Sequence, residues 1–298
     1  MLETLLAEGR SYHDTESLRL AGELEAAALA PVAPPLLAKF LQLSTHTIGE
    51  HLGDWPRARR LAERVLEGQA ATAETAMAWA WLSIARFLEG DAVQAAEAEL
   101  QCLGAGDSDF RGALIETRFM LAAAMVGSGR TDEAAAIYSG ALALARRAGN
   151  AAPARSVAVA SNNLASELAE AVSRTPSQDA LMETAAQAAH EFWKRCGTWV
   201  NEERALYLLA LVANVLGRPS EALGHAGAAL AIIEAHGDEP VDAAFLRLAR
   251  ARALGLSGDA DGQKVELDFA DAAASAWRDP SLLEWFARER AKSCRGHP

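Results

Sequence analysis

Five short glycine turns recur along the chain, and they constrain its fold more than any other feature. They read "HLGDWPRA", "LEGDAVQA", "GSGRTDEA", "VLGRPSEA" and "LSGDADGQ", with glycines at Gly53, Gly90, Gly129, Gly217 and Gly258. Successive glycines are 37, 39, 88 and 41 residues apart, and 88 is two periods of 44. The turn missing between them falls in the longer polar segment "AVSRTPSQDA". A repeated period of this length is typical of proteins in which each repeat packs on its neighbours.

Each period predicts a helical hairpin. Apolar helical segments such as "TAMAWAWLSIARFLEG" and "ERALYLLALVANVLG" precede the turns. The glycine permits the left-handed conformation that ends a helix, and the Asp, Pro or Thr after it starts the next. Small residues recur five and twelve positions after the glycine, on one helical stripe where two helices can approach closely. They are Ala58, Ala95, Ala134 and Ala222, with Gln263 in the last copy, and then Val65, Cys102, Ala141, Ala229 and Ala270.

This pattern resembles the tetratricopeptide repeat (TPR) family. In "GRTDEAAAIYSGAL", Gly129, Ala134, Tyr138 and Ala141 stand where that motif carries its glycine, alanine, aromatic and alanine. The resemblance covers roughly residues 35–277, and its periods exceed the usual length of about 34 residues. They look more like the longer repeats in sensor regions of bacterial transcriptional regulators. The resemblance implies an all-α, right-handed α-α superhelix of about six helical hairpins.

The two ends of the chain fit the repeat less well and are expected to be capping helices. Residues 1–30 form the predicted N-terminal cap, closed by Pro31, and residues 280–292 form the predicted C-terminal capping helix. No change of composition marks a linker between them. We therefore expect residues 1–298 to form a single TPR-like α-solenoid.

Composition restricts the partners and the compartment. The net charge of −12 disfavours nucleic acid unless a local basic stripe exists, and "RARRLAER" and "RERAKSCRGH" are expected to be solvated helix faces instead. The N-terminus lacks the basic start of a signal peptide, and no apolar run is long enough to span a membrane. Three cysteines suit a reducing compartment. These features predict a cytoplasmic protein that binds neither nucleic acid nor membrane.

No motif in the sequence predicts catalysis, a cofactor or a metal. "GSGRTDEA" lacks the spacing and the Lys-Ser/Thr of a phosphate-binding loop, so it is interpreted as a structural turn. His46 and His51 are five residues apart, which points them in different directions on an α-helix. The adjacent Glu202 and Glu203 diverge in the same way, and Cys102 occupies a packing position. The chain is therefore expected not to be an enzyme.

The resemblance also implies where a partner would bind. In such stacks the first helix of each hairpin lines a concave groove, which takes a protein or peptide partner. Asn side chains suit the backbone of an extended peptide, arginines suit a carboxylate, and aromatic rings serve as anchors. The candidate groove residues are Phe119, Asn162, Arg204, Tyr207, Asn214 and Arg252.

Three alternatives stay open at this point. The first is a regulatory protein that senses a small ligand or signal peptide, and the second is an enzyme with an unrecognised site built on helices. A packing role for the asparagines is the third. An apolar end of the stack would also allow a homodimer.

Overall fold

The chain is a helical repeat protein that folds into successive hairpins, as the sequence implied. The computed structural model describes residues 2–105, 110–151, 153–237 and 239–294, and within these ranges it contains helices and turns but no strand. Residues 1–153 and 154–298 form two compact units. The boundary falls between the third and fourth hairpins. The single solenoid and its right-handed superhelix stay predictions.

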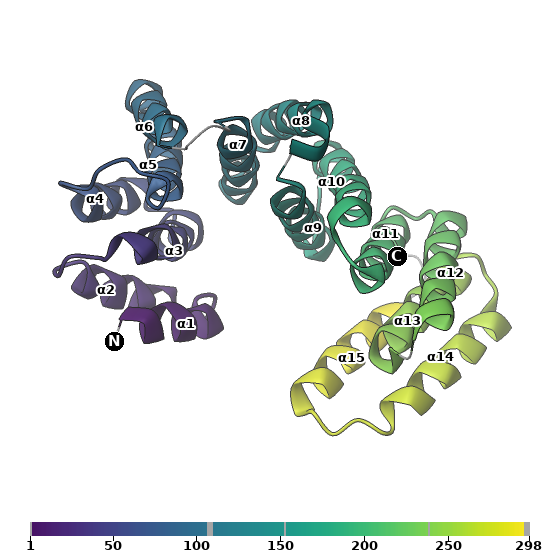
Figure 1. The fold of residues 1–298 in the computed structure, drawn as a ribbon. Coiled ribbons are helices and arrows are strands. Elements are labelled where there is room, and N and C mark those ends of the chain that lie inside the picture. The colour runs from purple at the N-terminus through teal and green to yellow at the C-terminus, as the bar shows by residue number, and fades with distance from the viewer. Residues whose placement is uncertain (1, 106–109, 152, 238, 295–298) are drawn as a thin grey trace. The chain divides into compact units, whose positions relative to one another are not determined.

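The first unit begins with two short capping helices and continues with three hairpins (Figure 1). The caps are α1 (Leu2–Tyr12) and α2 (Ser17–Ala27), which agree with the predicted cap at residues 1–30. The hairpins pair α3 (Pro34–Ser44) and the π-helix η1 (Thr45–His51) with α4 (Trp55–Leu66), α5 (Ala76–Glu89) with α6 (Ala92–Gly104), and α7 (Phe110–Gly127) with α8 (Thr131–Ala148). A short 3-10 turn, η2 (Gly149–Ala151), follows α8.

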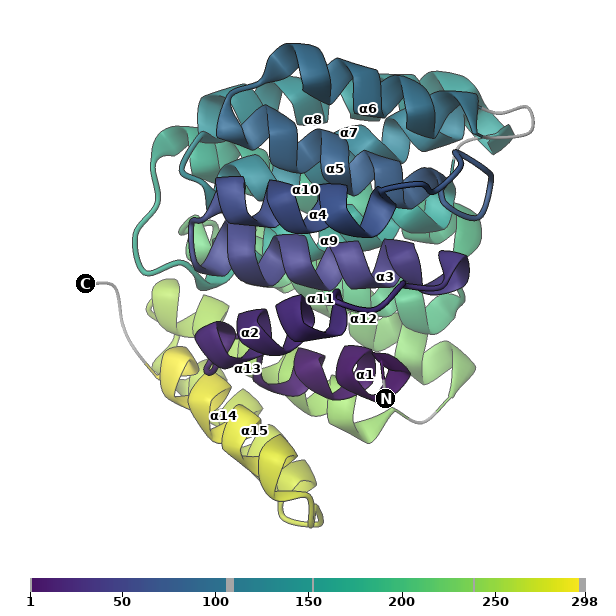
Figure 2. The same cartoon turned by 90° about the vertical axis from the view of Figure 1, so that its left-hand side faces the viewer.

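The second unit contains three more hairpins and a closing helix (Figures 1 and 2). The hairpins pair α9 (Ala154–Glu170) with α10 (Pro176–Cys196), α11 (Trp199–Val215) with α12 (Pro219–His236), and α13 (Pro240–Leu256) with α14 (Ala260–Ala274). The final helix α15 (Pro280–Ser293) packs on α13 and α14, as predicted for residues 280–292. The described residues thus form the expected six hairpins.

The five turn glycines adopt the conformation that their place in the sequence predicted. Their φ angles are 67° at Gly53, 108° at Gly90, 76° at Gly129, 68° at Gly217 and 81° at Gly258. A left-handed residue of this kind ends a helix at little cost only when it is glycine. In three hairpins the next residue is an aspartate whose carboxylate accepts a backbone hydrogen bond and caps the second helix; these are Asp54, Asp91 and Asp259.

The hairpin without a glycine uses an arginine side chain instead. Arg174 lies between α9 and α10, and its Nη1 donates to the carbonyl oxygens of Ala171 at 2.9 Å and Leu168 at 3.3 Å. Its Nε donates to Asp179 in the first turn of α10 at 2.7 Å. The last carbonyls of a helix need such a donor when no left-handed residue supplies backbone bonds. Arg174 therefore replaces the glycine turn.

The stripe of small residues forms the helix contacts. Ala58, Ala95, Ala134 and Ala222 are at most 3% exposed, whereas Gln263 in the last copy is partly exposed. The residues twelve after each glycine are likewise buried, from Val65 at 6% to Cys102 at 0%. Burial also raises the pKa of the Cys102 thiol, which agrees with its expected packing role.

The π-helix η1 changes the geometry of one stretch that the sequence suggested would be α-helical. A π-helix bonds residue i to residue i+5, so residues five apart lie about one turn apart. His46 and His51 consequently face each other, with their Nε2 atoms 3.0 Å apart. The expectation that these histidines point apart is therefore wrong, because it assumed α-helical geometry.

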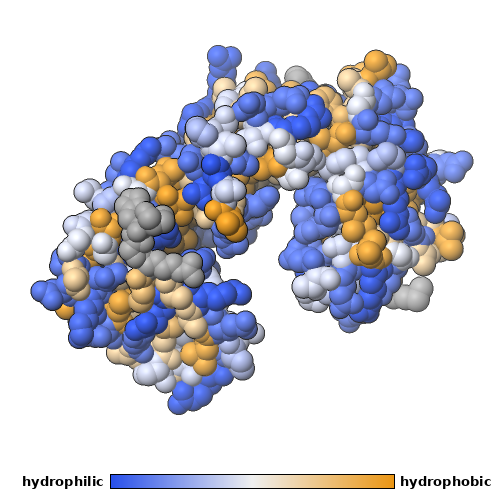
Figure 3. All heavy atoms as spheres, turned by 180° about the vertical axis from the view of Figure 1, so that it is seen from behind, coloured by the Kyte–Doolittle hydropathy of each residue, from blue (hydrophilic) through white to orange (hydrophobic). Residues whose placement is uncertain are grey.

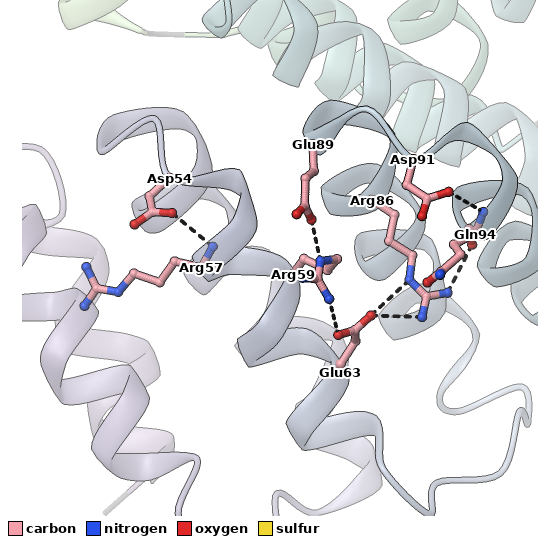
Figure 4. A network of polar contacts seen from close by, with 8 residues as sticks. All are labelled: Asp54, Arg57, Arg59, Glu63, Arg86, Glu89, Asp91 and Gln94. Atoms are coloured by element: carbon pink, nitrogen blue, oxygen red, sulfur yellow. Dashed lines mark hydrogen bonds and ion pairs between the residues drawn. The ribbon is translucent and has the colours of Figure 1, made fainter.

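Ion pairs tie the basic segment "RARRLAER" to the neighbouring helices (Figure 4). Arg59 of α4 pairs with Glu63 on its own helix and with Glu89 of α5. Arg86 of α5 donates to Glu63 at 3.0 Å and to the carbonyl oxygen of Gln94 at 3.0 Å. Two arginines of the segment, Arg57 and Arg59, are thus paired with glutamates of neighbouring helices, Glu25 of α2 and Glu89 of α5. None of the described helices combines the length and the low charge that crossing a membrane requires.

Candidate functional site

A cavity with a volume of about 1070 Å³ lies within the second unit. Its walls come from α9, α11 and α13, the first helices of their three hairpins, and from α15. Drug-sized ligands occupy pockets of about 300 to 1,000 Å³, so the volume is sufficient for a small molecule or for several residues of a peptide.

Five of the six candidate groove residues line this cavity. Asn162 comes from α9, Arg204, Tyr207 and Asn214 come from α11, and Arg252 comes from α13. Asn162 and Tyr207 are 45 residues apart and hold equivalent places in α9 and α11, whereas Arg252 lies one helical turn further along the same face of α13. The repeat therefore brings together side chains that are far apart in the chain.

Phe119, the sixth candidate, lies in the first unit and does not belong to this cavity. Its side chain is 2% exposed and packs edge-on against the ring of Tyr138, with the ring centroids 4.9 Å apart. Phe119 thus joins the first helix of its hairpin to the second. Such a contact stabilises the hairpin and leaves the ring no surface for a partner.

An aromatic wall occupies one side of the cavity. Phe245 is buried at its centre, and the ring of Trp285 from α15 stacks on it with centroids 4.1 Å apart. The ring of Tyr207 packs edge-on against that of Phe245, with the ring centroids 6.5 Å apart. Trp285 is 41% exposed, so part of this apolar surface faces solvent. The second unit carries hydrophobic surface in patches between hydrophilic side chains (Figure 3).

One cation in the cavity has no protein partner. Arg204 donates through Nε to Asp242 at 2.8 Å, and Lys292 donates to Glu289 at 2.7 Å. Within the part of the chain that the structure describes, Arg252 makes neither a hydrogen bond nor an ion pair, although it is half-buried. Its burial lowers the pKa of the guanidinium, because a desolvated cation is disfavoured. Arg252 is therefore the group best able to take an anion.

Two neutral polar side chains accompany Arg252. The hydroxyl of Tyr207 and the amide of Asn162 make no hydrogen bond to the described residues. Burial raises the pKa of Tyr207, so its hydroxyl stays protonated and can donate. The amide of Asn214, in contrast, already has a partner within the protein. Its Nδ2 donates to the carbonyl oxygen of Ala249 at 2.8 Å, and the side chain is 2% exposed. Asn214 therefore joins α11 to α13 and has a packing role.

A buried carboxyl group lies in the wall beside these residues. Glu203 is 0% exposed, and no hydrogen bond reaches either of its oxygens in the ionised form. Burial and the neighbouring Asp242 carboxylate raise the pKa of Glu203 to about 8, and Arg204 opposes this shift. Glu203 is therefore mostly neutral at pH 7, when it can share its proton with Asp242. Its neutrality leaves the cavity more positive than the formal charges suggest.

The sequence interpretation missed Glu203, Asp242 and Trp285 as lining residues. Glu202 and Glu203 do diverge, as expected, but Glu203 meets a carboxylate from another hairpin instead of its neighbour. The register of the repeat was the available signal, since Arg204 and Phe245 each lie thirteen residues before the turn glycine of their hairpin. No local pattern identifies Trp285, because α15 lies outside the repeat.

Seventeen chains of solved structures match this chain. No family model matches the sequence, and no curated protein matches it. The chain is similar to BtubC (BKLC) from P. vanneervenii, with 19% identity and a TM-score of 0.47 over 76% of this chain and 92% of that one. It is also similar to a kinesin light chain from Podosopora anserina with TPR-like repeats, with 16% identity and a TM-score of 0.37 over 83% of this chain and 99% of that one.

Proposed function

We propose that this helical repeat protein is a non-catalytic binding module whose second unit takes an acidic segment of a protein or peptide partner. The observation that carries the proposal is Arg252, a half-buried cation without a protein partner in a cavity of about 1070 Å³. A desolvated guanidinium gains free energy when a carboxylate makes two parallel hydrogen bonds with it.

The remaining lining residues support a peptide as the ligand. Tyr207 and Asn162 offer hydrogen bonds to a peptide backbone or to the same carboxylate. The exposed part of Trp285, stacked on Phe245, offers apolar surface for a neighbouring side chain. The motif we expect is therefore a carboxylate, either of a side chain or of a chain terminus, next to an apolar residue. Arg204 contributes less to ligand binding than the sequence suggested, because its guanidinium already donates a hydrogen bond to Asp242.

A peptide-display selection tests this proposal directly. The full chain and its Arg252→Met variant are screened in parallel, and Arg195→Met serves as the control because Arg195 lies on α10 outside the cavity. We expect acidic or free-carboxylate peptides to be enriched by the wild type and by R195M, with at least a tenfold loss of affinity in R252M. Peptides that bind R252M as tightly as the wild type would contradict the proposed role.

A second candidate function is sensing of a small anionic molecule by the same cavity. The volume of the cavity and the unpaired Arg252 support this alternative. A thermal-shift screen against metabolites distinguishes the two, because a small molecule that fills the cavity raises the melting temperature without any peptide. In either case we expect no catalytic turnover and a protein localised in the cytoplasm. Affinity purification from the native cell would then identify the partner.

A further inference from the structure

Three histidines and one aspartate of the first unit gather where α1 ends and η1 passes. They are His13, Asp14, His46 and His51, and one potential ligand atom from each lies within 4.8 Å of all the others. The first two residues follow α1 directly, and the last two lie on the π-helix. All four are at least partly exposed, so an ion can reach them from solvent.

The distances between the ligand atoms match those around a tetrahedral metal ion. Ligands at 2.0–2.1 Å from Zn²⁺ lie about 3.3 Å from one another. His51 Nε2 is 3.0 Å from His46 Nε2 and 3.3 Å from Asp14 Oδ1. His13 Nε2 is 3.1 Å from the same Asp14 oxygen. The other pairs of these atoms lie within 4.8 Å of each other, so side-chain shifts of about an ångström would place all four around one ion.

The opposite ring nitrogens of two histidines are already held as a metal site requires. His13 Nδ1 lies 2.8 Å from the carbonyl oxygen of Arg10, to which it can donate. His46 Nδ1 lies 2.6 Å from Glu50 Oε2, which accepts in the same way. Metal-binding histidines usually donate their second N–H to a carbonyl or a carboxylate, which leaves Nε2 unprotonated for the ion. Both rings therefore direct an Nε2 lone pair toward the cluster.

The π-helix supplies the remaining geometry. Because a π-helix bonds residue i to residue i+5, it places His51 next to His46 on the same face. In an α-helix, residues five apart lie on different faces.

We propose that His13, Asp14, His46 and His51 form a binding site for a divalent transition metal such as Zn²⁺. The ion joins the turn after α1 to η1 and so attaches the N-terminal cap to the first hairpin. Imidazole nitrogens favour Zn²⁺ and its neighbours in the transition series over Mg²⁺ and Ca²⁺. Glu50 is a positioning residue, since it orients His46 without reaching the ion.

Calorimetric titration of the full chain tests the site, using protein without a polyhistidine tag that has been freed of metal with a chelator. We expect one Zn²⁺ per chain at micromolar affinity or tighter, no binding of Mg²⁺, and a higher melting temperature with Zn²⁺. Co²⁺ in place of Zn²⁺ should give the intense visible absorption of a tetrahedral complex. A chain that binds no stoichiometric Zn²⁺ would show that the cluster is only a set of hydrogen-bonded histidines.

Variants locate the binding. Asp14→Asn and His46→Gln should weaken Zn²⁺ binding at least tenfold, and Glu50→Gln should weaken it by about 10- to 100-fold. His236→Gln, at the far end of α12 in the second unit, is the control and should keep wild-type affinity. Asp14 is 69% exposed at its side chain, so D14N keeps the fold and reports on the ion alone. Zn²⁺ binding of unchanged affinity in both D14N and H46Q would overturn the assignment.

Discussion

Gly49 lies directly beneath the indole ring of Trp55. A Cβ atom placed on Gly49 would fall 2.4 Å from Trp55 Cζ3, closer than carbon atoms approach in proteins. Trp55 is only 8% exposed and begins α4, so its ring cannot move away without leaving the core. This contact fixes the π-helix against the second helix of its hairpin.

Gly49→Ala should therefore destabilise the first unit. Overpacking of a close contact costs about 1–3 kcal/mol, so we expect a lower midpoint in urea unfolding followed by tryptophan fluorescence. Gly140→Ala is the matched control, because nothing lies within 4 Å of its added methyl group in α8. There the helix should gain roughly 0.5–1 kcal/mol from the better helix former. Equal effects of the two substitutions would contradict the packing argument.

Ala134→Leu should destabilise the third hairpin. Ala134 is 0% exposed and lies on the small-residue stripe, so a larger side chain costs about 1–3 kcal/mol. Arg130→Ala, four residues earlier, should cost no more than about 1 kcal/mol, because its pair with Glu133 is exposed. Chemical unfolding of both variants measures the difference. A loss in R130A as large as that in A134L would contradict the claim that the buried alanine stabilises this hairpin more than the exposed ion pair does.

Arg174→Gln should lower the free energy of unfolding of the second unit by more than the loss of an ordinary surface ion pair does. Arg174 bonds two carbonyl oxygens at the end of α9 as well as Asp179, and hydrogen bonds to charged groups contribute roughly 1.5–3 kcal/mol. Arg195→Gln removes an i,i+4 pair with Glu191 and the contact of the guanidinium with the Phe192 ring, and should cost about 1 kcal/mol in total. Thermal unfolding compares them, and faster amide exchange at the end of α9 in R174Q would localise the effect. Matching losses would mean that Arg174 is not the cap.

Glu203 should make the stability of the protein fall as pH rises from about 4.5 to 8. The folded protein binds the Glu203 proton more tightly than the unfolded chain, since its pKa is about 8 instead of the ordinary 4.5. That contribution is complete below pH 4.5 and is lost by the time pH passes 8, with a slope of up to about 1.4 kcal/mol per pH unit. Urea unfolding at pH 5 to 9 measures it.

Glu203→Gln should remove most of this pH dependence, because glutamine imitates the neutral acid. Glu202→Gln is the adjacent control; Glu202 is partly exposed near Lys194 and should leave the pH profile unchanged. A wild-type profile that stays flat over this range would show that Glu203 is ionised in the folded state.

The sequence alone determined the hairpins and how they pack. Left-handed glycines such as Gly129 and fully buried alanines such as Ala134 follow from local rules of chain geometry and volume, and these rules act within a few residues. The same rules placed Asn162, Tyr207 and Arg252 on one face of consecutive first helices, which the second unit turns into a cavity wall.

Only the tertiary structure decided which of these side chains remain available. Arg204 is occupied by Asp242 from another hairpin, Phe119 is buried against Tyr138, and Arg252 alone among these has no partner within the described ranges. The histidine cluster depends on the tertiary structure too, because a π-helix is set by packing around Gly49 and leaves no periodic signal in the sequence. A repeat period predicts which face of a helix a side chain lies on. It does not predict which side chain of another hairpin will contact it, because that depends on how the hairpins pack in space.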